Sequence, residues 1–91
     1  MEATRILVAG VQALSLPVRS TLELRYRRGL PVDAIAEIGL SDIAEVEAHI
    51  RSALNELAGH TGDRGPYALK LIERDLEGLS PAGWAGEVER L

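Results

Sequence analysis

A chain of 91 residues can build one hydrophobic core but is too short for two independent cores. Its composition is 46% hydrophobic, yet Trp and Tyr together contribute only three residues and Phe is absent, so Leu, Ile, Val and Ala must fill a core of packed helices. The lack of cysteine excludes disulfides, catalytic thiols and zinc ribbons, and the net charge of -4 argues against a strong non-specific grip on nucleic acid.

Two helices are predicted before the first strong glycine stop. Residues 3–14 carry apolar side chains at helical spacing, namely Ile6, Leu7, Val11 and Leu14, with Gly10 as a weak point. Pro17 opens a second helix, and Gly29 ends it because glycine readily adopts the left-handed conformation. The end of this second helix carries three arginines: Arg25, Arg27 and Arg28.

The next two predicted helices form a tightly joined pair. Pro31 opens a short third helix, with Val32, Ile35 and Ala36 facing inward, and Gly39 is expected to end it. Ser41 is the predicted N-cap of the fourth helix, with Asp42 placed against the positive helix end. About four turns are expected from an apolar stripe of Ile43, Val46, Ile50, Ala53, Leu54 and Leu57.

A glycine-rich stretch at 58–65 predicts a hinge before a C-terminal pair of helices. Pro66 opens the fifth helix, whose apolar side comprises Ala68 or Leu69, Ile72, Leu76 and Leu79. Ser80 and Pro81 begin a short sixth helix bearing Trp84, Val88 and Leu91. We therefore predict a single all-α domain over 1–91, with a helix-turn-helix core at 14–57 and a helical extension at 66–91.

The central run resembles a known family of transcription proteins. Two helices joined by a tight turn, with a longer second helix, are typical of the helix-turn-helix. Residues 13–57 (ALSLPVRSTLELRYRRGLPVDAIAEIGLSDIAEVEAHIRSALNEL) resemble the promoter-reading fourth region of bacterial sigma factors in their leucine-proline opening, LRY segment, IAE segment and Gly-Leu-Ser turn. Residues 46–57 are also similar to the last helix of LuxR-type regulator domains. Both resemblances imply DNA reading by the last helix, and region four implies docking on the flap of RNA polymerase.

The departures from region four concern the turn and the recognition helix. Pro31 replaces a serine-like cap, and the family's alanine-leucine-glycine step is shortened to Ile38 and Gly39, so we expect the turn to pack differently. Residues 33–57 hold six acids against one arginine, a balance of -5. The exposed set on the recognition helix is predicted to be Asp42, Glu45, Glu47, Ala48, His49 and Ser52. The basic face typical of a DNA reader is missing.

These patterns predict a cytoplasmic transcription regulator that binds promoter DNA, the transcription machinery or both. The predicted DNA-contacting residues are Arg25, Arg27, Arg28, Ser41, Asp42, Glu45, His49 and Arg51. A simpler interpretation makes the arginines favourable helix-end charges, with Glu23 pairing Arg27, and makes the acids a solvated face, with Glu47 pairing Arg51.

The alternative function is a degenerate helix-turn-helix that binds RNA polymerase, a sigma or anti-sigma factor, or a second copy of itself. Its predicted interface residues are Glu47, Leu69, Ile72, Leu76 and Trp84. The C-terminal apolar side chains either pack back on the helix-turn-helix or form a homo-oligomer contact. No catalytic residue, metal or cofactor is predicted, since the two histidines are isolated and no phosphate-binding loop is present. No apolar stretch is long enough for a membrane partner.

Overall fold

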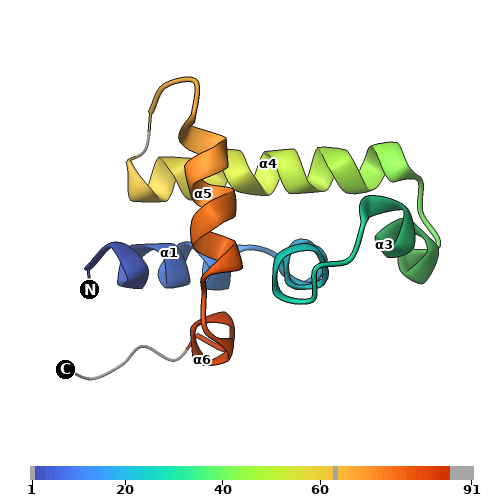
Figure 1. Cartoon of the computed structure of the whole chain (residues 1–91), viewed down its shortest axis with the longest axis horizontal. Coiled ribbons are helices and arrows are strands. Elements are labelled where there is room, and N and C mark those ends of the chain that lie inside the picture. The colour runs from blue at the N-terminus through green and yellow to red at the C-terminus, as the bar shows by residue number, and fades with distance from the viewer. Residues whose placement is uncertain (1, 63, 87–91) are drawn as a thin grey trace.

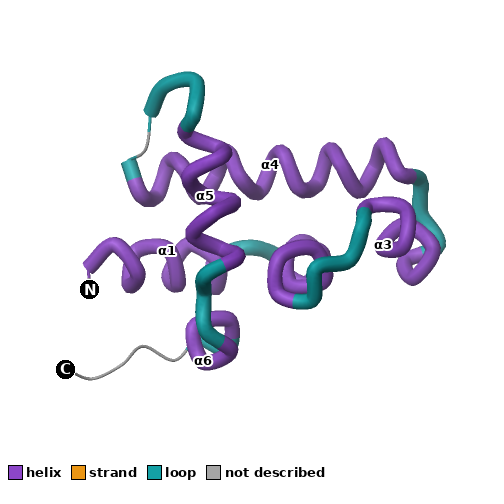
Figure 2. The backbone as a smooth tube through the Cα atoms, in the orientation of Figure 1, coloured by secondary structure: helices purple, strands orange, loops and turns teal. Residues whose placement is uncertain are grey.

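All regular structure in the computed structural model, which describes residues 2–62 and 64–86, is helical. Figures 1 and 2 show the helices and the loops that join them. The elements are α1 (Glu2–Ala13), α2 (Leu16–Leu22), a π-helical turn η1 (Glu23–Arg27), α3 (Val32–Gly39), α4 (Ile43–Thr61), α5 (Ala68–Glu77) and α6 (Pro81–Trp84). The prediction of an all-α fold is confirmed. None of the described helices combines the length and apolar character needed to cross a membrane.

The long helix α4 is the centre of the packing, because α1, α2, α3 and α5 all contact it. In Figure 1, α3 lies at the N-terminal end of α4 and α5 crosses it nearer its C-terminal end. The residues that α4 buries recur every three or four positions: Val46, Ile50, Ala53, Leu54, Leu57 and Ala58. The predicted stripe is confirmed from Val46 to Leu57, but buried Ala58 extends it, and Ile43, the first residue of α4, is 49% exposed.

A close approach of α1 to α4 explains the glycine within α1. A Cβ atom on Gly10 would lie 2.9 Å from Leu57 Cδ2 and 3.3 Å from the His60 ring. Leu57 is fully buried, so its side chain has little freedom to move aside. Gly10 therefore lowers helix propensity but lets the two helices approach, which the periodicity of α1 alone does not reveal.

The two C-terminal helices, α5 and α6, contribute buried side chains to the same core. Ala68, Ile72 and Leu76 of α5 are buried, and Trp84 of α6 is 2% exposed. The predicted cap of α6 is confirmed, since the Ser80 hydroxyl accepts a hydrogen bond from the Gly83 amide at 3.1 Å, with Pro81 in the first turn. The predicted continuation through Val88 and Leu91 lies outside the described residues.

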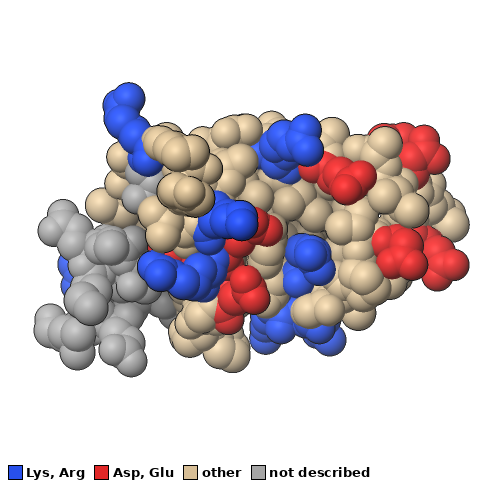
Figure 3. Space-filling view, turned by 45° about the horizontal axis from the view of Figure 1, so that its top comes forward, with Lys and Arg blue, Asp and Glu red and all other residues tan. Residues whose placement is uncertain are grey.

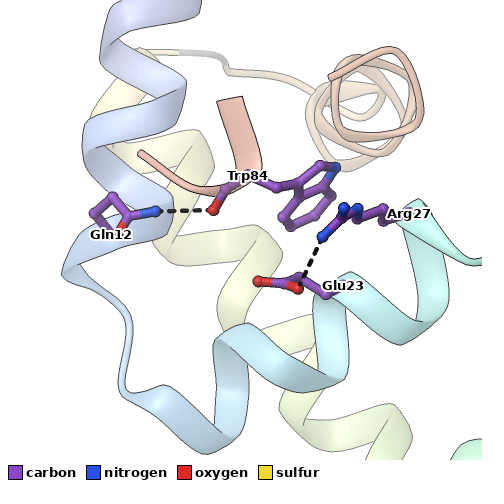
Figure 4. A network of polar contacts seen from close by, with 4 residues as sticks. All are labelled: Gln12, Glu23, Arg27 and Trp84. Carbon is purple, nitrogen blue, oxygen red and sulfur yellow. Dashed lines mark hydrogen bonds and ion pairs between the residues drawn. The ribbon is translucent and has the colours of Figure 1, made fainter. Parts of the chain in front are cut away.

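Gln12 joins this last helix to the beginning of the chain. Its Nε2 donates to the Trp84 carbonyl oxygen at 3.1 Å (Figure 4), and its Oε1 accepts from Arg19 Nη1 at 2.7 Å. One amide side chain therefore links α1, α2 and α6. Figure 4 also shows the Trp84 indole pointing toward the ion pair of Glu23 and Arg27.

The connection between α4 and α5 begins later than predicted. Residues 58–61 continue α4, and Gly62 ends it in the left-handed conformation at φ 80°. Ala58 is buried, so helical packing prevails over the glycine content of this stretch. Pro66 lies in the turn before α5, which begins at Ala68, so the predicted proline start is wrong by two residues.

Candidate interaction surface on the helix-turn-helix

Three residues, Leu40, Ser41 and Asp42, connect α3 to α4, the helix that the sequence predicts as the recognition helix. The N-cap of α4 is Asp42, with extended backbone angles of φ -83° and ψ 150°, and its side chain makes no capping hydrogen bond. The predicted N-cap, Ser41, is therefore wrong by one residue. Asp42 still places a negative charge beside the positive end of α4.

The end of α3 is a Schellman turn whose left-handed residue is a leucine. The Ser41 amide donates to the Ala36 carbonyl at 2.9 Å, and the Leu40 amide donates to the Glu37 carbonyl at 3.3 Å. Leu40 has a φ of 53°, while the predicted stop, Gly39, is still helical. Gly39 therefore comes one residue before the position that adopts the left-handed conformation.

Replacing Leu40 with glycine is expected to raise the free energy of unfolding by about 1 kcal/mol, because a left-handed conformation costs an L-residue about 1–2 kcal/mol that glycine avoids. The measurement is urea denaturation followed by far-UV circular dichroism. Gly39→Ala is the companion variant, since a Cβ there would meet only Ser41 Oγ at 3.4 Å. It should also be neutral or stabilising; a loss of stability in Leu40→Gly would contradict the strain argument.

Three aliphatic side chains lie exposed around this turn, and we call Ile38, Leu40 and Ile43 the apolar tip. Their exposed fractions are 63%, 95% and 49%, respectively. Interpretation of the sequence missed this surface, although one signal pointed to it. Val32, Ile35 and Ala36 share the inner face of α3, and Ile38, though three residues after Ile35, lies well to one side of the centre of that face.

Exposed carboxylates occur on the same elements as the apolar tip, namely α3, the turn and the start of α4. We call Asp33, Glu37, Asp42 and Glu45 the acidic rim. In Figure 3 the end of the molecule that holds α3 and the start of α4 shows red side chains and no blue ones, whereas red and blue lie together over the middle. No lysine or arginine occurs anywhere in residues 29–50. The surface of the turn is therefore both apolar and anionic.

The three arginines of the cluster predicted to contact DNA differ in their exposure and in their partners. Arg25 is half-buried, with Nη1 donating to the Leu30 carbonyl at 3.1 Å and its guanidinium 6.0 Å from the centre of the Tyr26 ring. Arg27 Nη1 lies 3.6 Å from Glu23 Oε2, which confirms the predicted helical ion pair. Arg28 is exposed, and it makes no ion pair with any residue that the structure describes.

The residues predicted to contact DNA from α4 and the turn before it are all exposed, as is Glu47 of the predicted partner interface: Ser41, Asp42, Glu45, Glu47, His49 and Arg51. The predicted pair of Glu47 with Arg51 does not form, since the ion pairs found within 4.0 Å in the described chain join Arg27 to Glu23 and Arg74 to Asp75. Glu47 and Arg51 instead lie on the walls of one shallow groove. The first turns of α4 thus present acids, and Arg51, one turn beyond Glu47, is the first cation along the helix.

That groove lies between η1, the start of α3, α4 and α5 and has a volume of about 270 Å³. Buried Tyr26, Ile50 and Leu54 form its apolar part, while two arginines and two glutamates line the same space. The complete lining is Arg25, Tyr26, Val32, Glu47, Ile50, Arg51, Leu54, Leu69 and Glu73. The fold therefore brings Arg25 together with Arg51, but alternating charges leave the groove without a dominant sign.

One strong polar contact joins η1 to α5 inside this groove. The Tyr26 hydroxyl donates to Glu73 Oε2 at 2.7 Å. Burial, the hydrogen bond to Glu73 and the negative charge of that carboxylate all raise the pKa of Tyr26 above its ordinary value of about 10. The neutral phenol is thus the form that the folded chain favours.

Tyr26→Phe is expected to lower stability at neutral pH by about 1.5 kcal/mol, the low end for a hydrogen bond to a charged group, because Glu73 is only half-buried. Since the folded pKa is raised, this tyrosine's contribution is complete below pH 10 and is lost as the pH rises further. Denaturation of the parent chain at a series of pH values above 10 should show that Tyr26 lowers the free energy of unfolding by about 1.4 kcal/mol per pH unit.

The phenylalanine variant should lack that part of the alkaline slope. Tyr67→Phe is the matched control, because it removes a hydroxyl that is exposed on the loop before α5, and it should keep the slope. Equal alkaline slopes in Tyr26→Phe and the parent chain would contradict the assignment to Tyr26.

The residues predicted as a partner interface have two different locations. Glu47 is exposed and Leu69 is half-buried, and both line the groove. The prediction is corrected for Ile72, Leu76 and Trp84, because all three are buried within the core of a single chain. The apolar side of α5 and the indole of α6 pack back on the helix-turn-helix, which was the other alternative left open by the sequence.

Comparison of the chain with protein-family models, with curated proteins and with solved structures gives no match. The resemblance to sigma region four consequently stays a prediction drawn from residues 13–57.

Proposed function

We propose that this chain is a transcription regulator of the helix-turn-helix type that acts by contacting a protein of the transcription machinery. The observation that carries the proposal is the chemistry of the turn and the start of the recognition helix, where a DNA reader needs donors and cations. Here that surface presents the apolar tip and the acidic rim. Apolar side chains bordered by charge are suited to a protein surface.

The charge of the recognition helix weighs against base reading as the main activity. Asp42 and Glu45 lie at the helix start, which in helix-turn-helix proteins approaches the base edges. A carboxylate accepting from cytosine N4 contributes about 1–3 kcal/mol at one base pair, but carboxylates repel phosphates at every sequence. The repulsion therefore outweighs a single favourable contact.

Promoter DNA is the second candidate, and the observation in its favour is the exposure of Arg28 and Arg51. Neither guanidinium forms an ion pair with the described part of the chain, so both are available to phosphates. Two such contacts would give a slope of log K against log salt of about -1.8. Such binding would be weak compared with that of proteins making six to ten phosphate contacts, roughly the usual range.

The deciding experiment measures binding of the whole chain to purified RNA polymerase from its source cell, and separately to promoter duplexes over a range of salt. We expect a saturable complex with polymerase and little affinity for DNA. Glu45→Lys should weaken the polymerase complex, while Glu56→Lys, an equal charge change farther along α4, should not. Failure to bind core polymerase and its sigma-bound form would overturn the proposal.

A DNA-binding result would be recognised by its salt dependence. Removing Arg28 and Arg51 by alanine substitution should then reduce the magnitude of the slope by about 0.9 for each phosphate that the chain no longer neutralises. The control replaces Arg64 and Lys70, two exposed cations away from the helix-turn-helix, and should leave the slope unchanged.

A further inference from the structure

The apolar tip has no role in the core, and its surroundings indicate what would cover it. We propose that it anchors a docking site for a basic amphipathic helix of a partner protein, with Leu40 as the central contact. This inference names the chemistry of the partner in the proposed function and rests on that function. It is carried by the exposure of the tip, the backbone conformation of Leu40 and the charge around both.

The side chain at position 40 is the most exposed large hydrophobic group of the described residues, at 95%. Its left-handed backbone makes leucine a costly choice, since glycine or asparagine satisfies the same turn with less strain and without an apolar surface. Strain of this kind is typical of functional positions. Ile38 and Ile43 extend the apolar surface on either side of the turn.

The acidic rim determines the charge of the occupant. Four exposed carboxylates lie on the elements that carry the tip, and residues 29–50 contain no lysine or arginine to balance them. A phosphate backbone or an anionic membrane surface would be repelled here. An amphipathic helix with Lys and Arg beside its apolar stripe matches both features, because its long cationic side chains reach outward over the acids while its stripe covers the tip.

A second copy of this chain offers a poorer complement. Its own basic cluster at the end of η1 is largely engaged, since Arg25 donates to the Leu30 carbonyl and Arg27 pairs with Glu23. Only Arg28 of that cluster is exposed without an ion pair among the described residues. A partner with a continuous apolar stripe and several cations therefore fits the tip better than a copy of the chain does.

The test uses two synthetic helical peptides that share a leucine stripe, one with lysines beside it and one with glutamates at the same positions. Each is titrated into the whole isotope-labelled chain, and binding is mapped by amide chemical shifts. The lysine peptide should shift residues 37–45 and dissociate as salt rises, whereas the glutamate peptide should not bind.

Matched variants test whether the peptide binds the apolar tip specifically or binds exposed apolar and acidic residues in general. Leu40→Asn introduces a residue that tolerates the left-handed turn, and it should lower the affinity for the lysine peptide about tenfold. Leu16→Asn alters another exposed leucine, at the start of α2, and should leave the affinity unchanged. Glu37→Lys with Glu45→Lys and Glu56→Lys with Glu77→Lys each raise the net charge from -4 to 0, but only the first pair should abolish binding.

Several results would overturn the docking site: shifts centred on the groove or α5, equal binding of both peptides, or an unchanged affinity in Leu40→Asn. Concentration-dependent shifts of the tip without peptide would assign the surface to a second copy instead. The polymerase experiment distinguishes failure of the docking site from failure of the proposed function. If the lysine peptide docks on the tip but polymerase does not bind, the transcription role is wrong and the docking surface stands; if polymerase binds equally to Leu40→Asn, the docking inference is wrong.

Discussion

Trp84→Ala is expected to lower the free energy of unfolding by about 3–5 kcal/mol, a large share of the 5–15 kcal/mol that stabilises roughly any domain of ordinary size. The indole is 2% exposed and belongs to the core cluster, so alanine would leave a cavity among side chains from several helices. The hydrogen bond from Gln12 to the Trp84 carbonyl involves the backbone and survives the change. Thermal denaturation followed by far-UV circular dichroism should show a midpoint lower by about 15 °C or more.

Two controls assign that loss to the cavity. Tyr67→Ala removes an exposed aromatic side chain and should change stability by less than about 0.5 kcal/mol. Trp84→Phe should lose less than half as much as Trp84→Ala, because the buried indole Nε1–H has no hydrogen-bond partner in the described structure and phenylalanine removes this unsatisfied donor. A loss below about 1 kcal/mol in Trp84→Ala would contradict the core role of the indole.

Leu57→Ala should lower stability by about 2–5 kcal/mol, because the side chain is fully buried between α4 and α1. The contact with Gly10 allows a sharper test. A Cβ at position 10 would lie 2.9 Å from Leu57 Cδ2, so Gly10→Ala should clash in the parent chain but fit into the space left by Leu57→Ala. A double-mutant cycle measured by urea denaturation should give a coupling of about 0.5–3 kcal/mol.

The matched control for this cycle is Gly59→Ala. It lies on the same α4 helix, and a Cβ there would have no neighbour within 4 Å. The substitution should stabilise the chain by up to about 1 kcal/mol through helix propensity, equally with Leu57 and with alanine at that position. Additive effects of Gly10→Ala and Leu57→Ala would contradict the close approach of α1 to α4.

The order and faces of the helices could be predicted because they follow from local patterns. The stripe of α4 and the stop at Gly29, with a φ of 68°, needed only spacing and glycine chemistry. The ends of α3 and α4 were harder to place. A glycine at position 39 suggested the stop, but hydrogen bonding placed the left-handed residue on Leu40, and buried Ala58 carried α4 past the expected hinge.

The candidate surface was only half predictable from the chain. The acids were visible in the sequence and their exposure was expected, but Ile43 was assigned to the core because its spacing matches the buried stripe. Spacing cannot tell where a helix leaves the core, since that depends on what packs against its first turn. The groove likewise joins residues from η1, α3, α4 and α5, and no local pattern brings Arg25 near Arg51.

The link between Gln12 and Trp84 spans 72 positions of the chain and ties the first helix to the last. During synthesis the ribosome releases α1 long before the tryptophan that completes its packing. A nascent chain can form the helix-turn-helix locally, but it must wait for α6 before the core closes, since contacts between distant positions form late. Translation that stops short of α6 should therefore yield a product that proteases recognise as incomplete, even though its helix-turn-helix segment is entire.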